Sequence, residues 1–279
     1  MKTLSNIPDS APLSFGERLG VRKPLSIIKI GGNIIDNPTE LSQFLSDFSK
    51  MEGNKILVHG GGKSATKMAQ SIGLTPQMID GRRITDQPML DVVVMIYAGE
   101  INKNIVAQLQ ANNTNAMGFS GADGNLIQSN KRNHPTIDYG FVGDVQKVNR
   151  PLLETLINYG IVPVFCAITH DKNGQLLNTN ADTIASELAI AASEVFEVTL
   201  NYCFEKAGVL TDVEDENSVI QQINSVLYSK LKAEGAIHSG MIPKLDNCFN
   251  SLSKGVQKIK IGHHRMLKDS ETICTSIEL

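Results

Sequence analysis

The sequence has little of what three large classes of protein require. No apolar run approaches the roughly eighteen residues of a membrane span, and the first 23 residues lack the apolar centre of a signal peptide. A net charge of −3 provides no basic excess for nucleic acid or an anionic membrane surface. We therefore expect a cytoplasmic protein that has neither a membrane nor a nucleic acid as its partner.

Cysteine is also scarce, at 4 of 279 residues, and no Cys-x-x-Cys spacing occurs. The widely separated cysteines argue against a metal knuckle or a redox pair, so we expect reduced and mostly buried thiols. His263 and His264 are adjacent, but no third ligand lies at a useful spacing from them. We interpret both histidines as surface residues and predict no metal site in the protein.

What is present is the composition of an ordinary globular protein, with 41% hydrophobic and 20% charged residues. The length allows one large domain or two lobes. Short apolar strands alternate with helices after residue 23, which predicts an α/β fold: a three-layer αβα sandwich with a mainly parallel open sheet in two lobes. Residues 1–23 contain several prolines and glycines with little periodicity, so we predict a flexible N-terminal extension. We place the lobes at residues 24–194 and 195–279.

Two glycine-containing turns follow short apolar strands. The first strand ends in Lys29-Ile30-Gly31-Gly32, and the second leads into His59-Gly60-Gly61-Gly62. Glycines let backbone N–H groups approach an anion closely, and a lysine adds a positive charge that phosphate oxygens can share. Three residues without a Cβ before a helix can also surround an oxyanion. Each turn is a candidate anion site, although each alone is also compatible with a simple connection.

Polar residues in three later stretches complete the candidates. The loop Gly81–Thr85 carries Arg82 and Arg83, and we expect one of them to point inward, where a guanidinium can hold a carboxylate bidentately. Asn178-Thr179-Asn180-Ala181-Asp182 precedes an alanine-rich helix, and a helix cap explains only one of its polar residues. Lys244 lies in the first turn of a later helix and offers a second lysine for phosphate.

Several other elements are predicted from the periodicity. A long helix from about Pro88 to Gln110 carries an apolar stripe suited to both the core and a dimer surface. The members of this stripe are Leu90, Val93, Val94, Tyr97, Ile101, Ile105 and Leu109. Phe141–Val145 indicates a glycine-bent hairpin arm, and Ile161–Ile168 indicates one buried strand. We further expect a strand at Val209–Asp212 and a helix near Asn217–Leu231.

Taken together and in order, these motifs resemble those of the amino acid kinase family, over a region that runs from Leu25 almost to the C-terminus. The five motifs are Lys29–Gly32, His59–Gly62, Gly81–Thr85, Asn178–Asp182 and Gly240–Lys244. The stretch Gly140–Val145 is similar to the hairpin that covers the acyl-amino-acid site in this family. A separate phosphate loop is excluded, because no Gly-x-x-x-x-Gly-Lys-Ser/Thr sequence occurs.

The resemblance implies ATP-dependent phosphorylation of the side-chain carboxylate of N-acetyl-L-glutamate, a step of arginine biosynthesis, with succinyl left open as the acyl group. Mg²⁺ would arrive bound to ATP. The catalytic residues implied are Lys29 and Lys244, with Asp182 aligning both lysines. The acylglutamate would bind to Gly61, Gly62, Arg83 and Asn178. ATP would bind to Gly31, Gly32, Thr211 and Asp212, and the glycines in both sets would supply backbone donors.

Residues 24–194 would accordingly bind the acyl amino acid and form a homodimer, and residues 195–279 would bind the nucleotide. Because residues 1–23 look non-helical, we expect a dimer with weak or no inhibition by arginine. Two alternatives stay open: another member of the family acting on aspartate, free glutamate or carbamate, and a catalytically silent nucleotide-binding sensor. The triple glycine and Asn178–Asp182 favour the acylglutamate branch, and the two lysines with Asp182 argue against a silent sensor.

Overall fold

The computed structural model describes residues 22–79, 82–212, 214–237, 241–269 and 271–279. Most of the predicted N-terminal extension lies outside these ranges, as do Gly81 and Gly240 of two of the motifs. The first strand begins at Lys23, the last residue assigned to that extension.

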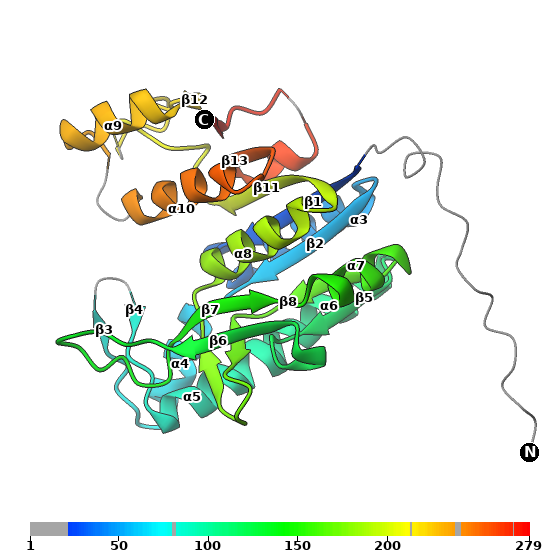
Figure 1. The fold of residues 1–279 in the computed structure, drawn as a ribbon, viewed down its shortest axis with the longest axis vertical. Coiled ribbons are helices and arrows are strands. Elements are labelled where there is room, and N and C mark those ends of the chain that lie inside the picture. Colours follow the sequence, from blue (N-terminus) through cyan, green and yellow to red (C-terminus); the bar gives the residue numbers. More distant parts are fainter. Residues whose placement is uncertain (1–21, 80–81, 213, 238–240, 270) are drawn as a thin grey trace, which may run out of the picture.

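A central sheet of eight strands runs through the part of the chain that is described, in the order β12-β14-β13-β11-β1-β2-β8-β5 (Figure 1). Every neighbouring pair is parallel except β13 with β14, which confirms the predicted mainly parallel open sheet. The strands are β1 (Lys23–Ile30), β2 (Asn54–His59), β5 (Ala116–Phe119), β8 (Val162–Phe165), β11 (Phe196–Phe204), β12 (Gln222–Ile223), β13 (Lys258–His263) and β14 (Thr275–Ile277).

The first strand lies in the middle of this sheet because its sequence is apolar on both faces. Leu25, Ile27, Ile28 and Ile30 are all at most 1% exposed, as expected for a parallel strand covered by helices on both sides. β1 pairs with β11 on one side and with β2 on the other. The end of β1 therefore lies among the carboxyl ends of its neighbours.

Helices cover both faces of the sheet, and the direction of the chain explains which helix covers which face. From β1 the chain moves outward through β2 to β5, and α3 packs beside α6 along this half. It then returns through β8 to β11 and β13, and α8 packs between α7 and α10. Right-handed crossovers that reverse direction place the two sets on opposite faces, with the switch between β1 and β11, where ligands of such sheets bind.

The helices of the two layers and their extensions have the following bounds: α2 (Gly32–Ile35), α3 (Pro38–Lys50), α4 (Gly62–Ser71), α5 (Gln87–Val94), η1 (Met95–Ile101), α6 (Asn102–Ala111), η2 (Asp123–Asn125), α7 (Arg150–Asn158), α8 (Ala181–Ser193), α9 (Ser225–Ala233), α10 (Ile242–Ser253) and η3 (His264–Leu267).

Two smaller sheets stand beside the carboxyl ends of the central strands (Figure 1). One has the order β10-β9-β6-β7 and the other pairs β3 with β4. The predicted hairpin arm is β7, which begins at Gly143 and pairs antiparallel with β6. The strands are β3 (Met78–Ile79), β4 (Arg82–Arg83), β6 (Ile127–Lys131), β7 (Gly143–Val148), β9 (Ile168–His170) and β10 (Leu176–Asn178).

The long helix predicted from Pro88 to Gln110 is present, but its middle is wider than an α-helix. α5 continues into the π-helical segment η1 (Met95–Ile101), which continues into α6. The predicted apolar stripe faces the core, and all of its members except Val94 are buried. Periodicity cannot reveal such a segment, because the change from i→i+4 to i→i+5 bonding shifts the helix face only locally.

Three predicted elements are wrong in detail. The single strand at Ile161–Ile168 is divided into β8 and β9, which belong to different sheets. Val209–Asp212 is not a strand, and only an isolated bridge joins Leu210 to Val219. The helix expected from Asn217 begins later, at Ser225, because the side chain of Asn224 accepts the N–H of Leu227 and caps α9 there.

Other sequence predictions agree with the structure. All four cysteines are free, and all but Cys274 are buried. Within the described ranges, no helix combines the length and the apolar character that crossing a bilayer requires. The predicted division after residue 194 falls between α8 and β11, and it stays a prediction.

Candidate active site

The structure brings the three predicted catalytic side chains together at the carboxyl end of β1. Lys29 Nζ lies 2.8 Å from Asp182 Oδ1, and Lys244 Nζ lies 3.8 Å from Asp182 Oδ2. The side chains come from β1, α8 and α10, and they are 15%, 20% and 19% exposed respectively. One carboxylate thus holds two ammonium groups that lie more than two hundred residues apart in the sequence.

Asp182 is available for this pairing because a neighbour caps the helix. The side chain of Asn180 accepts the backbone N–H groups of Asp182 at 2.8 Å and Thr183 at 3.1 Å, so Asn180 is the N-cap of α8. Burial alone would raise the pKa of Asp182, but the nearby Lys29 and Lys244 outweigh it and hold that pKa below its usual value. The carboxylate is therefore ionised at neutral pH.

Lys244 is held by aromatic rings as well as by Asp182. Its Nζ lies 5.2 Å from the ring centre of Phe204 and 5.7 Å from that of Tyr202, both at the end of β11. The hydroxyl of Tyr202 also donates to the backbone oxygen of Asp182 at 3.2 Å and lies 2.7 Å from Ser186 Oγ. The end of β11 therefore fixes α8 and the lysine of α10 against each other.

The first glycine turn differs in one respect from its predicted role. Gly31 donates its N–H to the carbonyl oxygen of Cys203 at 2.9 Å and so extends the pairing of β1 with β11. This donor is not available to a phosphate, contrary to the prediction. Gly32 begins the short helix α2, where the first N–H groups have no partner within the helix. The nucleotide role of Gly31 and Gly32 stays a prediction.

A cavity of about 200 Å³ lies at the start of α8, the helix that carries Asp182. Ala181 and Thr183, the residues on either side of Asp182, contribute to its wall. The wall also includes the four residues predicted to bind the acyl amino acid, which are Gly61, Gly62, Arg83 and Asn178. The four come from the start of α4, from β4 and from β10, so the fold gathers three separate parts of the chain into one place.

Two polar side chains of this pocket are oriented by hydrogen bonds. Arg83 is buried, and its Nη2 donates to Gly62 O at 2.9 Å and to Thr66 Oγ1 at 2.8 Å. Arg82 is exposed, but it lines the same cavity, so the two arginines differ in burial and not in which of them faces the pocket. Asn178 Nδ2 donates to Thr85 Oγ1 at 3.0 Å.

Sequence reasoning missed two further residues of the pocket, Arg132 and Tyr97. The Nε of Arg132 lies 3.1 Å from each carboxylate oxygen of Asp144, which belongs to β7. No spacing in the sequence distinguished Arg132 from an ordinary loop residue. Tyr97 was predicted only as a member of the apolar stripe, although its side chain carries a hydroxyl group. Burial raises the pKa of this phenol.

Thr211 and Asp212 do not join the lysines. Both are exposed, and they bond within their own loop: Thr211 N–H donates to Ser218 O at 3.1 Å and Asp212 N–H donates to Ser218 Oγ at 3.1 Å. No hydrogen bond or ion pair within the described ranges connects either residue to Lys29 or Lys244. Their predicted contact with ATP is untested by this geometry.

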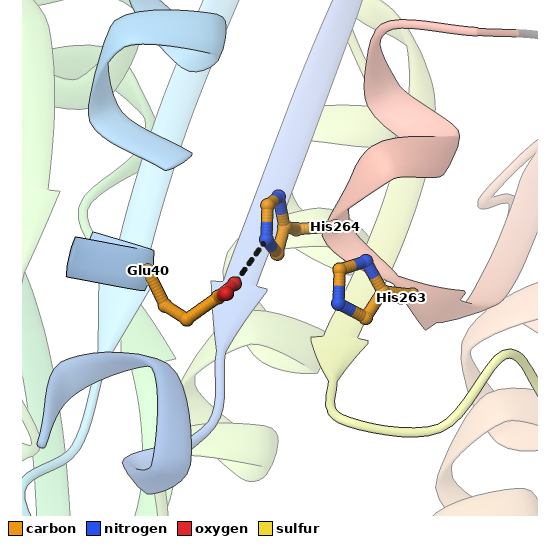
Figure 2. Close-up of side chains that lie close together, drawn as sticks. All are labelled: Glu40, His263 and His264. Carbon is orange, nitrogen blue, oxygen red and sulfur yellow. Dashed lines mark hydrogen bonds and ion pairs between the residues drawn. The ribbon is translucent and has the colours of Figure 1, made fainter. Parts of the chain in front are cut away.

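A cluster of possible metal ligands lies elsewhere, between α3 and η3 (Figure 2). Among the described residues, Glu40, His263 and His264 are the one group of at least three whose ligand atoms lie within 4.8 Å of one another. His264 is only 2% exposed and its Nε2 lies 3.1 Å from Glu40 Oε2. The prediction that both histidines are surface residues is therefore wrong for His264, because η3 packs against α3 and buries its first residue.

The atoms of this cluster already make hydrogen bonds with one another and with the next turn of the chain. His263 Nδ1 accepts the N–H of Arg265 at 3.3 Å. If a metal bound the other ring nitrogen, Nε2, then Nδ1 would carry the proton and could no longer accept this hydrogen bond. Arg265 also lines the cavity beside Glu40. The hydrogen bond from His264 is the main cause that lowers the pKa of Glu40.

Comparisons with known proteins show the family of the chain. A sequence model of the amino acid kinase family matches residues 24–263. An acetylglutamate kinase of Cytophaga hutchinsonii is 57% identical over 238 residues, covering 85% of this chain and 90% of the relative. One of Bacteroides fragilis is 53% identical over 241 residues, covering 86% and 92%.

Solved structures share the fold at low sequence identity. The protein smu.665 of Streptococcus mutans superposes with a TM-score of 0.72 at 24% identity, over 91% of this chain and 98% of the other. A carbamate kinase of Giardia superposes with a TM-score of 0.64 at 15% identity, over 92% and 98%. The family model and the relatives of more than half identical sequence lead to one conclusion: the chain belongs to the amino acid kinase family.

Proposed function

We propose that this protein transfers the γ-phosphoryl group of ATP to the side-chain carboxylate of N-acetyl-L-glutamate, as the names of its relatives say of them. The observation that carries the proposal is the Lys29–Asp182–Lys244 group beside a pocket that presents Arg83 and Asn178. The lysines suit a transferred phosphoryl group. The arginine fork and the amide suit the carboxylate and amide groups of an acylated amino acid.

The chemistry needs no general base, because the acceptor carboxylate is already ionised at neutral pH. Catalysis therefore consists of holding the two substrates in line and stabilising the charge that spreads over the transferred group. Lys29 and Lys244 perform the second task from opposite sides of Asp182. Asp182 keeps the ammonium groups in place before the substrates bind.

Mg²⁺ is best supplied with the nucleotide. A protein site for Mg²⁺ needs oxygen ligands, mainly carboxylates. Asp182, the carboxylate between the lysines, is already shared by two cations, so it is a poor ligand for a third. We therefore assign the metal to the ATP phosphates, where it neutralises charge on the nucleotide.

The deciding experiment is an ATP-dependent assay that traps the acyl phosphate with hydroxylamine. N-acetylglutamate, N-succinylglutamate, free glutamate and aspartate are compared side by side with the purified protein. We expect the highest kcat/KM with N-acetylglutamate. A preference for N-succinylglutamate would change the acyl group, a preference for an unacylated amino acid would change the branch of the family, and no product with any acceptor would end the proposal.

A further inference from the structure

We propose that His59 and Asn102 position the glycine turn Gly60–Gly62 so that the backbone N–H of Gly61 is directed at the anion bound in the pocket. The inference rests on the proposed function for the identity of that anion. His59 is completely buried and Asn102 is 1% exposed. Neither residue lines the cavity, so both act through the turn and neither is a catalytic residue.

The hydrogen bonds fix both the orientation of Asn102 and the tautomer of His59. Asn102 Nδ2 lies 3.0 Å from the carbonyl oxygen of Val164 and 3.0 Å from His59 Nε2. Because the Val164 oxygen can only accept, this nitrogen is the donor, and His59 Nε2 must accept its second hydrogen. The proton of the neutral ring is then on Nδ1, which lies 2.8 Å from Gly60 O and donates to it.

The planar peptide bond carries this constraint to the pocket. In a trans peptide the C=O and the following N–H point in opposite directions. A ring that binds the carbonyl of Gly60 from the protein interior therefore turns the N–H of Gly61 away from the interior. Gly60, Gly61 and Gly62 all line the cavity, so the N–H of Gly61 faces the space in which an anion binds.

The π-helical segment supplies the other side of the same support. Asn102 follows directly after η1, and Tyr97 and Ile101 of η1 press on Gly61. A Cβ at Gly61 would lie 2.4 Å from Ile101 Cδ1 and 2.9 Å from Tyr97 Cδ1. The π-helical segment thus contacts Gly61 through Tyr97 and Ile101, and the residue that follows it, Asn102, holds His59. Such π-helical segments are frequent at functional sites.

Substitutions at His59 separate this role from proton transfer. In His59→Gln the amide can still donate to Gly60 and accept from Asn102, whereas in His59→Leu it can do neither. We expect kcat/KM for N-acetylglutamate to fall by about 100-fold or more in H59L and in Asn102→Leu, and by less than about 10-fold in H59Q. The pH profile of H59Q should match that of the unmodified protein.

Asn201→Leu is the matched control. Asn201 is also buried, but its side-chain hydrogen bond to Thr199 O is long, at 3.5 Å. This variant should therefore keep kcat/KM within about 3-fold.

A second readout does not depend on activity. Long-range ¹⁵N–¹H spectra of the histidine-labelled protein between pH 5.5 and 8 should show one neutral ring with its proton on Nδ1. That signal should be absent in H59Q and displaced in N102L. The inference would be overturned if the ring whose signal disappears in H59Q were protonated on Nε2 or titrated near pH 6.5, or if H59L kept full activity. If the unmodified protein has no kinase activity but its spectrum shows the Nδ1–H ring, the proposed function fails and the hydrogen-bonded support of Gly61 stands.

Discussion

Single residues decide the chemistry at the end of β1, and Lys29 is the most direct test. Its ammonium group contacts Asp182, and the proposed function gives it the task of stabilising the transferred phosphoryl group. Lys29→Ala should lower kcat by about 10²–10³-fold, the usual cost of removing one preorganised donor to a transition state. Lys50→Ala, at the exposed end of α3, should leave kcat unchanged. Normal turnover by K29A with all acceptors would refute the assignment of this lysine.

His59 predicts a dependence of stability on pH. Burial lowers its pKa from 6.5 to about 4, so between these values the unfolded chain binds a proton that the folded protein does not. Stability therefore falls as the pH falls through 6.5, and by pH 5 this group alone costs about 2 kcal/mol relative to pH 7. Urea unfolding at both pH values should show that H59Q loses about 2 kcal/mol less than the unmodified protein does. Equal losses in the two proteins would contradict a neutral buried His59.

Residue identities near the site were predictable to the extent that their motifs are local. Lys29, Asp182 and Lys244 each stand in a short characteristic stretch, and the fold brought them together. Arg132 could not be predicted, because its place in the pocket depends on the pairing of β6 with β7. The loss of the Gly31 donor was equally invisible, since it follows from the register of β1 against β11.

At the scale of elements, the contact between η1 and the glycine turn leads to a prediction for Gly61→Ala. Gly61 has a φ of 152°, and a methyl group there would overlap Ile101 and Tyr97. We expect G61A to lose about 1–3 kcal/mol of stability through overpacking and to bind the acceptor more weakly.

Gly73→Ala is the matched control for this prediction. Gly73 also has a positive φ, of 82°, but a methyl group at this residue would meet nothing within 4 Å. G73A therefore reports the backbone penalty of a left-handed residue without a clash. Thermal unfolding and acceptor KM of the two variants should differ, and equal KM values would show that contact with η1 does not shape the turn.

Elements themselves were predictable where one rule applies along the whole element. The strands and helices from β1 to α4 follow simple apolar runs and cap signals, including the Asn37 cap of α3. The division of Ile161–Ile168 was not predictable, because both halves are equally apolar and only their different partners separate them. The π-helical segment was hidden for the same reason, since its side chains are buried like their α-helical neighbours.

The whole molecule is predicted to be a homodimer, and Met95 tests that prediction. Met95 is 56% exposed on the long helix that also carries the apolar stripe, which itself is used in the core. Light scattering after gel filtration should give twice the monomer mass of 30.3 kDa. Met95→Glu should reduce that mass if this face is the interface.

Val226→Glu is the control, because Val226 is 78% exposed on α9 in the other predicted lobe. It should leave the mass unchanged. A hexamer that is strongly inhibited by arginine would contradict both the dimer and the expected insensitivity to arginine.

The alternation of strands and helices was enough to predict the layers of the molecule. It did not predict that β8 lies between β2 and β5, because the pairing of strands that are far apart in the sequence decides this order.

The double pairing of Asp182 has a consequence for the speed of encounter. Two ammonium groups share one carboxylate, so this corner of the protein is locally cationic although the chain carries a net charge of −3. The net negative charge of the chain disfavours a polyanion at long range, whereas the lysine pair favours one at the end of β1. On the proposed function, we expect the association rate of ATP to depend on ionic strength, because added salt weakens both the repulsion and the attraction.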